Sequence, residues 1–135
     1  MYIKTDPLDK LVSQITRTKA KNLCQRCGRY TEYANLQTAH CWGRRKKSVR
    51  YDLENVLALC FSCHRIIDSE SPEAKREVFI RHLGEKGYEA LNQRANWPHQ
   101  YKPDLKAIKF YLENELKHLK NKRDSGDSSK PGDRF

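Results

Sequence analysis

The chain has little apolar sequence and no long apolar run. Its 135 residues are 37% hydrophobic and 33% charged, and the mean hydropathy is −0.95. No segment approaches the roughly 18 consecutive apolar residues of a membrane-spanning helix, and the first ten residues contain no apolar signal core. We therefore expect a cytoplasmic protein with no membrane partner. A chain this polar buries only a modest core, so a structural metal ion would suit it.

The cysteine content does not fit a closed disulfide framework. Five cysteines is an odd number, which favours reduced thiols that hold a metal ion. Four of them form two Cys-x-x-Cys pairs, Cys24 with Cys27 and Cys60 with Cys63. Two such turns supply the four soft ligands of tetrahedral zinc, so the sequence predicts a structural Zn²⁺ site. We expect Cys41, which is left over, to be a small buried residue rather than a ligand.

Acidic residues are the minority charge, 17 against 27 lysines and arginines, and the formal net charge is +10. This balance favours a polyanionic partner, and nucleic acid more than a membrane surface, because the densest basic run does not lie on an amphipathic helix. Phosphate contacts from such a run give affinity and position without sequence preference. A solvated loop is the alternative interpretation. The run consists of Arg44, Arg45, Lys46, Lys47 and Arg50, flanked by Trp42 and Tyr51, which suit base stacking and core packing equally.

Turn and cap signals divide the chain into helices and short strands, with no internal repeat. Asp6 and Pro7 suit a helix start, and Gly84 suits a helix end. The last stretch is polar and rich in Gly, Ser and Pro, so we expect one domain over residues 1–120 and a disordered tail over 121–135. The predicted elements are helix 7–19, strands 36–41 and 56–60, a short helix from about residue 62, helices 72–83 and 86–96, and an amphipathic helix 105–119.

A second group of polar residues lies within and just after the segment between the cysteine pairs. His40 ends the first predicted strand, Asn55 begins the second, and His64 follows Cys63 directly. If four sulfurs complete the zinc site, His64 is free, and Asp68 lies one helical turn later on the same face. A histidine and a carboxylate at this spacing can share a divalent cation such as Mg²⁺ or Mn²⁺. A solvated carboxylate near a helix end is the alternative for Asp68.

These residue types suit hydrolysis of a phosphodiester bond. The reaction requires a base that activates water and a cation that stabilises the charged phosphorane and leaving oxygen. His40 suits the base, because an ordinary histidine pKa lies near 6.5. Asn55 is neutral, and its amide can bond the backbone on both sides, so it would hold the loop and orient His40.

The order His40, Asn55, His64, with separations of 15 and 9 positions, resembles the HNH endonucleases, and "AHCWGRRKKSVRYDLENVLALCFSCH" carries most of the resemblance. The resemblance implies an α+β fold, a zinc-stapled ββα-metal (HNH) core with additional flanking α-helices. It also assigns catalytic roles to these three residues and a catalytic Mg²⁺ or Mn²⁺ to His64 and Asp68. Ala39 stands where many HNH proteins carry a metal-binding Asp or His, so the cation would depend on two protein ligands.

A finer resemblance extends over about residues 20–122. "RYDLENV", "VFIRHLGEKGYEAL" and the final lysine-rich helix look like the phage recombination endonucleases of the NinG (Rap) family. That similarity implies a structure-specific enzyme that cuts branched recombination intermediates in the cytoplasm of a bacterial host. A homodimer would suit branch cutting, although no sequence feature sets the oligomeric state. The alternatives are a nicking or site-specific HNH endonuclease and a non-catalytic, zinc-stabilised DNA-binding protein.

Overall fold

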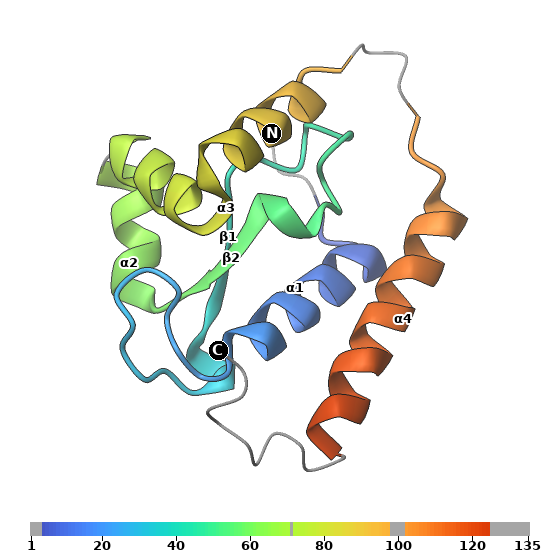
Figure 1. Ribbon diagram of the computed structural model, residues 1–135, viewed down its shortest axis with the longest axis horizontal. Coiled ribbons are helices and arrows are strands. Elements are labelled where there is room, and N and C mark those ends of the chain that lie inside the picture. The colour runs from blue at the N-terminus through green and yellow to red at the C-terminus, as the bar shows by residue number, and fades with distance from the viewer. Residues whose placement is uncertain (1–3, 71, 98–101, 125–135) are drawn as a thin grey trace.

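The protein is an α+β fold in which a two-stranded sheet lies between helices. The structure is a computed structural model, and it describes residues 4–70, 72–97 and 102–124. Figure 1 shows the arrangement. The elements in chain order are α1 (Pro7–Ala20), β1 (Gln37–His40), β2 (Val56–Leu59), α2 (Phe61–Arg65), α3 (Pro72–Ala95) and α4 (Leu105–Asp124), with short 3-10 turns at Tyr33–Asn35 and Leu53–Asn55 and a π-helical segment at Ile66–Glu70.

Helix α1 begins with a reciprocal capping box. The Asp6 carboxylate accepts a hydrogen bond from the backbone N–H of Asp9 (2.8 Å), and the Asp9 carboxylate accepts one from the N–H of Asp6 (2.9 Å). These bonds satisfy two N–H groups at the start of the helix, and Pro7 fits its first position. The predicted first helix is therefore confirmed, and it ends at Lys21, whose φ of 54° is left-handed.

The two strands pair antiparallel and divide the core between their faces. Ala39 pairs with Leu57, and His40 pairs with Val56. Successive side chains in a strand point to opposite faces. Ala39, with Leu57 and Leu59, packs into a cluster with Ile67 and Phe79 from the π-helical segment and α3. The other face packs on α1 and α4, in a cluster of Val56, Val12, Ile15 and Leu112.

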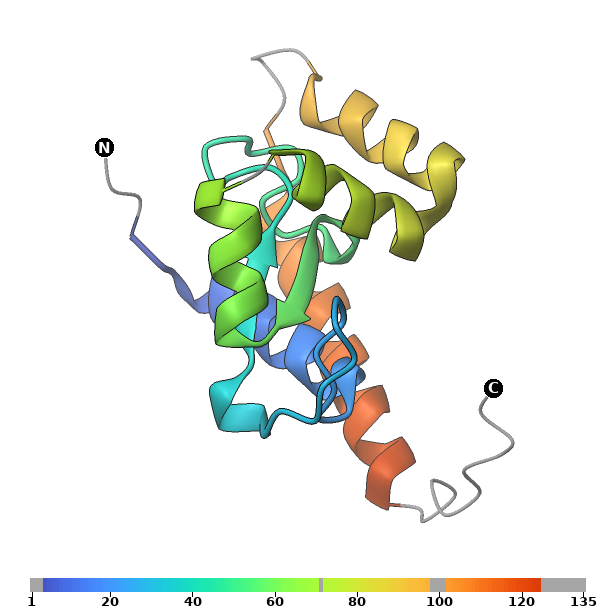
Figure 2. The ribbon, with the colours of Figure 1, turned by 90° about the vertical axis from the view of Figure 1, so that its left-hand side faces the viewer.

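The views in Figures 1 and 2 show the layers that result from this division. Helices α1 and α4 pack together on one side of the sheet, and α2 and α3 lie on the other. Burial of each large apolar side chain contributes about 1.5–3 kcal/mol, so both faces stabilise the strands. The predicted strands, the α+β class and the amphipathic final helix are confirmed.

Helix α3 is interrupted at Gly84, whose φ of 78° and ψ of 163° are not helical. The predicted helix end is confirmed there, and the predicted second helix forms the part that ends at Ala95. That second part covers the long loop between the strands. Leu91 and Ala95 pack against Val49 of the loop.

The C-terminal helix extends beyond the expected boundary of the domain. We expected the polar tail to begin at residue 121, whereas α4 continues to Asp124. Residues 125–135 of the predicted tail lie outside the described residues. Among the helices that the structure describes, none is long and apolar enough to span a membrane.

Candidate active site and metal centre

The two Cys-x-x-Cys pairs meet in space as a four-sulfur cluster. The Sγ atoms of Cys24, Cys27, Cys60 and Cys63 all lie within 4.8 Å of one another, and those of Cys27 and Cys60 are 3.9 Å apart. Four thiolates placed about 2.3 Å from a tetrahedral zinc ion would be separated by roughly 3.8 Å. The cluster therefore has the donors and the spacing of a structural zinc site.

The backbone of the first cysteine turn directs N–H groups at the sulfur of Cys24. The N–H groups of Arg26 and Cys27 donate to the Cys24 sulfur at 3.4 and 3.5 Å. Burial opposes ionisation of Cys24, but these and neighbouring donors outweigh it and lower the pKa of the thiol to about 6. Gly28 completes the turn with a φ of 80°. These donors favour the thiolate form that a zinc ligand requires.

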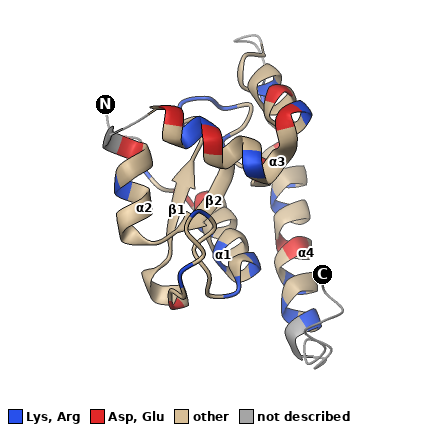
Figure 3. Cartoon of the chain, turned by 60° about the vertical axis from the view of Figure 1, so that its left-hand side comes forward, with Lys and Arg blue, Asp and Glu red and all other residues tan. Residues whose placement is uncertain are grey.

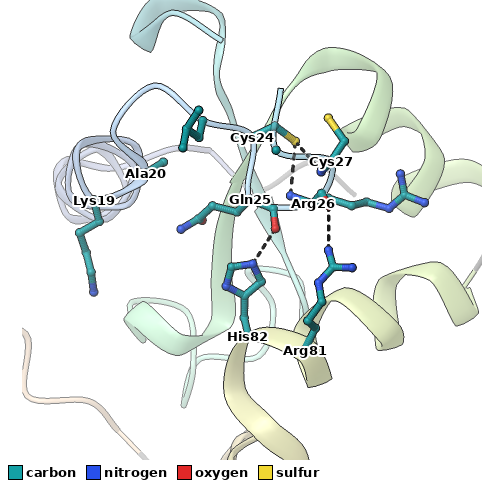
Figure 4. Close-up of a pocket in the computed structure, with 10 residues that line it drawn as sticks. Lys19, Ala20, Cys24, Gln25, Arg26, Cys27, Arg81 and His82 are labelled. Atoms are coloured by element: carbon teal, nitrogen blue, oxygen red, sulfur yellow. Dashed lines mark hydrogen bonds between the residues drawn. The ribbon is translucent and has the colours of Figure 1, made fainter. Parts of the chain in front are cut away.

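Helix α3 braces the same turn from outside, as Figure 4 shows. His82 Nε2 donates to the Gln25 carbonyl (2.6 Å), and Arg81 donates to the Arg26 carbonyl (2.8 Å). The Arg26 guanidinium donates in turn to the Cys63 sulfur of the other pair (3.4 Å). His82 is exposed, and it ties α3 to the first cysteine turn through a contact across 57 positions that no local sequence pattern indicates.

His64 is directed at Asp68 rather than included in the sulfur cluster. Its Nε2 atom lies 3.3 Å from an Asp68 carboxylate oxygen, and its backbone N–H donates to the Cys60 carbonyl (2.9 Å). A Mg²⁺ ion about 2.1 Å from each ligand atom fits between donors at this separation. Asp68 is exposed and His64 is half-buried. The pair can therefore share a cation that solvent and substrate also reach.

His40 lies at the end of β1, within electrostatic reach of this pair. Its pKa is lowered from the ordinary value, first by burial and then by the positive charge of Arg44. His64 acts in the same direction, whereas Asp9 and Asp68 oppose it. The neutral imidazole, which can accept a proton, therefore predominates at neutral pH.

Asn55 is fully buried and ties the loop after His40 to the start of β2. Its side-chain oxygen accepts from the Trp42 N–H (2.8 Å), and its side-chain nitrogen donates to the carbonyls of Trp42 (2.9 Å) and Val49 (3.2 Å). Its own carbonyl accepts from the N–H of Cys41 (2.8 Å). The residue directly after His40 is thereby held in place.

The basic run divides into two groups. The Arg50 guanidinium bonds both carboxylate oxygens of Asp9 at 3.1 and 2.7 Å, and Arg44 Nη1 lies 3.7 Å from the same carboxylate. These two arginines connect the loop to α1. Lys47 is exposed, and Lys46 lies over the Trp42 ring at 5.3 Å from its centroid.

The two aromatic residues that flank the run are held within the protein. Trp42 Nε1 donates to Asn92 of α3 (2.9 Å), and the Tyr51 hydroxyl donates to Asp6 (2.6 Å). Both side chains are half-buried. The sequence suited both base stacking and core packing, and in the structure both side chains pack within the protein.

Asp9 is the main residue of the site that the sequence interpretation missed. Its side chain is only 6% exposed, which is rare for a carboxylate without charged partners. In sequence it is recognisable only as part of a helix start. The signal available was an acidic residue at the third helical position, which predicts a capping box and not a contact with Arg50.

Comparison with protein families places the site in a known domain. Residues 24–70 match the family model described as HNH endonuclease, and this range contains both cysteine pairs, His40, Asn55, His64 and Asp68. The chain therefore carries an HNH domain with four cysteines positioned to bind a metal ion. Searches of curated proteins and of solved structures gave no significant match.

We predict that Cys24→Ser loses the zinc ion and unfolds much of the domain. Structural zinc contributes about 10–16 kcal/mol to small metallo-domains, as much as the total stability of about 5–15 kcal/mol of a typical domain. Metal content by mass spectrometry and thermal melting by circular dichroism measure both effects. Cys41→Ser is the matched control and should keep one zinc ion. A cooperative, wild-type-like melt of Cys24→Ser would contradict the structural role of the metal.

We predict that Asn55→Ala lowers the free energy of unfolding by at least about 2 kcal/mol, because it leaves buried backbone groups of the loop without partners. Urea denaturation measures the loss. The Trp42 amide should also exchange with solvent faster, since Asn55 accepts its hydrogen bond. Asn114→Ala, on an exposed position of α4, is the control and should be close to neutral. Unchanged exchange at Trp42 would show that Asn55 does not hold the loop.

Proposed function

We propose that this protein is a metal-dependent endonuclease that hydrolyses DNA phosphodiester bonds. The observation that carries the proposal is the separation of two sites within one HNH domain. Four sulfurs suffice for a structural zinc ion, and His64 and Asp68 converge on a separate point, within electrostatic reach of His40. A domain used only to bind DNA has no need of the second arrangement.

Each residue has a distinct part in the proposed reaction. Neutral His40 removes a proton from the water that attacks the phosphorus atom. Asn55 holds the backbone next to His40 and takes no proton. His64 and Asp68 would hold Mg²⁺ or Mn²⁺, which when bound stabilises negative charge on the phosphate oxygens. Ala39 is fully buried in the apolar core, so two protein residues would hold this ion, and water and the DNA phosphate would supply its other ligands.

The DNA partner is supported by charge. The net charge of +10 favours binding to a polyanion, and Arg45, Lys46 and Lys47 belong to the loop that directly follows the proposed base. Phosphate contacts there would position the strand without reading its sequence. Arg44 and Arg50 belong to the same predicted DNA-binding run. Because both pair with Asp9, they would contribute to DNA binding indirectly, by holding the loop in shape.

The substrate class is a finer part of the proposal. The resemblance to phage recombination endonucleases of the NinG (Rap) family supports branched intermediates as substrates and a bacterial host cytoplasm as the setting. A homodimer would place two active sites on one branch. There are two alternatives. One is a nicking or site-specific HNH endonuclease. The other is a non-catalytic DNA-binding protein, because Ala39 stands where many HNH proteins carry a ligand of the catalytic metal ion.

We predict that the purified protein cuts DNA with Mg²⁺ or Mn²⁺ and prefers a four-way junction to linear duplex. Gel assays on both substrates and on plasmid measure this. His40→Ala should reduce the rate by at least about 100-fold, the usual contribution of a general base, while zinc content and DNA affinity stay close to wild type. Equal cutting of both substrates would favour the nicking enzyme, and bound but uncut DNA would favour the binding protein.

We predict that kcat/KM rises with pH as His40 loses its proton and reaches a plateau, with a midpoint below the ordinary histidine value of about 6.5. Burial and Arg44 disfavour the protonated form, so the base is available at lower pH. Arg44→Gln should move the midpoint to higher pH, and Arg44→Lys, which keeps the charge, should move it less. A midpoint that is the same in wild type and Arg44→Gln would remove His40 from the role of titrating base.

A further inference from the structure

A groove of about 360 Å³, lined by polar and charged residues, opens beside His40, between α1 and β1. Helix α1 lies outside residues 24–70, which match the HNH family model, so that match assigns nothing to the α1 side of the groove. The residues that line the groove and matter here are Lys10, Ser13, Gln14 and Arg17 of α1, together with His40 and Arg44.

The four α1 residues form one stripe of the helix. Their positions follow the spacing i, i+3, i+4 and i+7, which places side chains on a single face. The opposite, apolar stripe packs into the core through Val12 and Ile15. From residue 10 to residue 17 the helix rises about 10 Å, so cationic side chains at the two ends of the stripe can reach different phosphates of one strand.

Charge in the groove is positive, because its acidic residue is already paired. Asp9 also lines the groove, but its carboxylate is bonded to Arg50 at 2.7 Å and lies 3.7 Å from Arg44. Lys10 and Arg17 then add two cations along the stripe. Figure 3 shows basic residues on α1 and on the loop between the strands.

Arg17 is held in a fixed position at one end of the stripe. Its guanidinium carbon lies 4.4 Å from the centroid of the Tyr33 ring, and its Nε–H donates to the Ser13 carbonyl at 3.4 Å. That bond uses one of five N–H donors. A guanidinium with restricted motion loses less entropy when it binds a phosphate.

We propose that this groove holds the sugar–phosphate backbone of the DNA strand next to the scissile phosphate, with Lys10 and Arg17 as phosphate contacts. The inference rests on the proposed nuclease function for the position of the scissile bond. The groove includes His40 and Arg44, so a strand that follows α1 arrives directly at the base. Ser13, Gln14 and Thr38 supply neutral hydrogen-bonding groups between the charged contacts.

The test compares two double variants with the same change of charge, both in a His40→Ala background so that DNA is not cut. One is Lys10→Gln with Arg17→Gln. The matched control is Lys86→Gln with Lys109→Gln, at exposed positions of α3 and α4. Fluorescence anisotropy with a labelled duplex gives Kd over a range of salt concentrations. Thermal melting checks that each variant is folded.

We expect the groove variant to bind roughly tenfold or more weakly near physiological salt, and to lower the magnitude of the salt slope of log K by about 0.9 per lost phosphate contact. The control should change both quantities much less. Lys10→Gln alone keeps the contact between Arg17 and Tyr33 and should lower the slope by about one. It therefore tests the groove even if the double variant does not fold.

Two outcomes overturn the inference. Equal losses in the groove variant and the control would show that only net charge matters, and a parent protein that does not bind DNA would exclude the groove as well. A parent protein that binds DNA through the groove, but whose wild-type form cuts no substrate with Mg²⁺ or Mn²⁺, is a different result. It would reject the nuclease function and retain the groove as a DNA-binding site.

Discussion

Convergence of four sulfur atoms is the constraint on which the rest of the structure depends. The 32 residues between Cys27 and Cys60 contain both strands and the loop that joins them, and the two cysteine pairs hold the ends of that segment together. Only two short strands pair within it. Such a small sheet is marginal without further support. The same four-cysteine cluster fixes the start of α2, because His64 directly follows Cys63 in the chain.

The positions of the catalytic candidates depend on the cysteine cluster and on two further sets of contacts, those of Asn55 and those of Asp9. Asn55 fixes the backbone next to His40 through three side-chain hydrogen bonds. The bond between Asp9 and Arg50 fixes the far end of the loop to α1. The proposed base is thus held on a short strand by contacts from both directions, and the loop needs no regular secondary structure of its own.

The local features of the fold could be predicted, and the long-range contacts could not. Helix starts at Asp6 and Pro72, the break at Gly84 and both strands follow from cap residues, glycine and apolar spacing, which act over a few positions. The four-cysteine cluster was predictable because a structural zinc ion takes four ligands, and two Cys-x-x-Cys pairs supply that number. Contacts of Asp9 with Arg50, and of Trp42 with Asn92, join positions about 41 and 50 apart. Their residue types are common on surfaces, so nothing in the sequence distinguishes them.

Helix α1 is part of the site rather than an accessory to it. Its apolar stripe packs on the sheet, its capping carboxylate Asp9 holds two arginines of the loop, and its polar stripe lines the groove beside His40. Asp9 pairs with two arginines of the loop and so neutralises part of the loop's positive charge. In the DNA-binding mode that we propose, Lys10 and Arg17 would replace that charge from the same helix, on the groove beside His40.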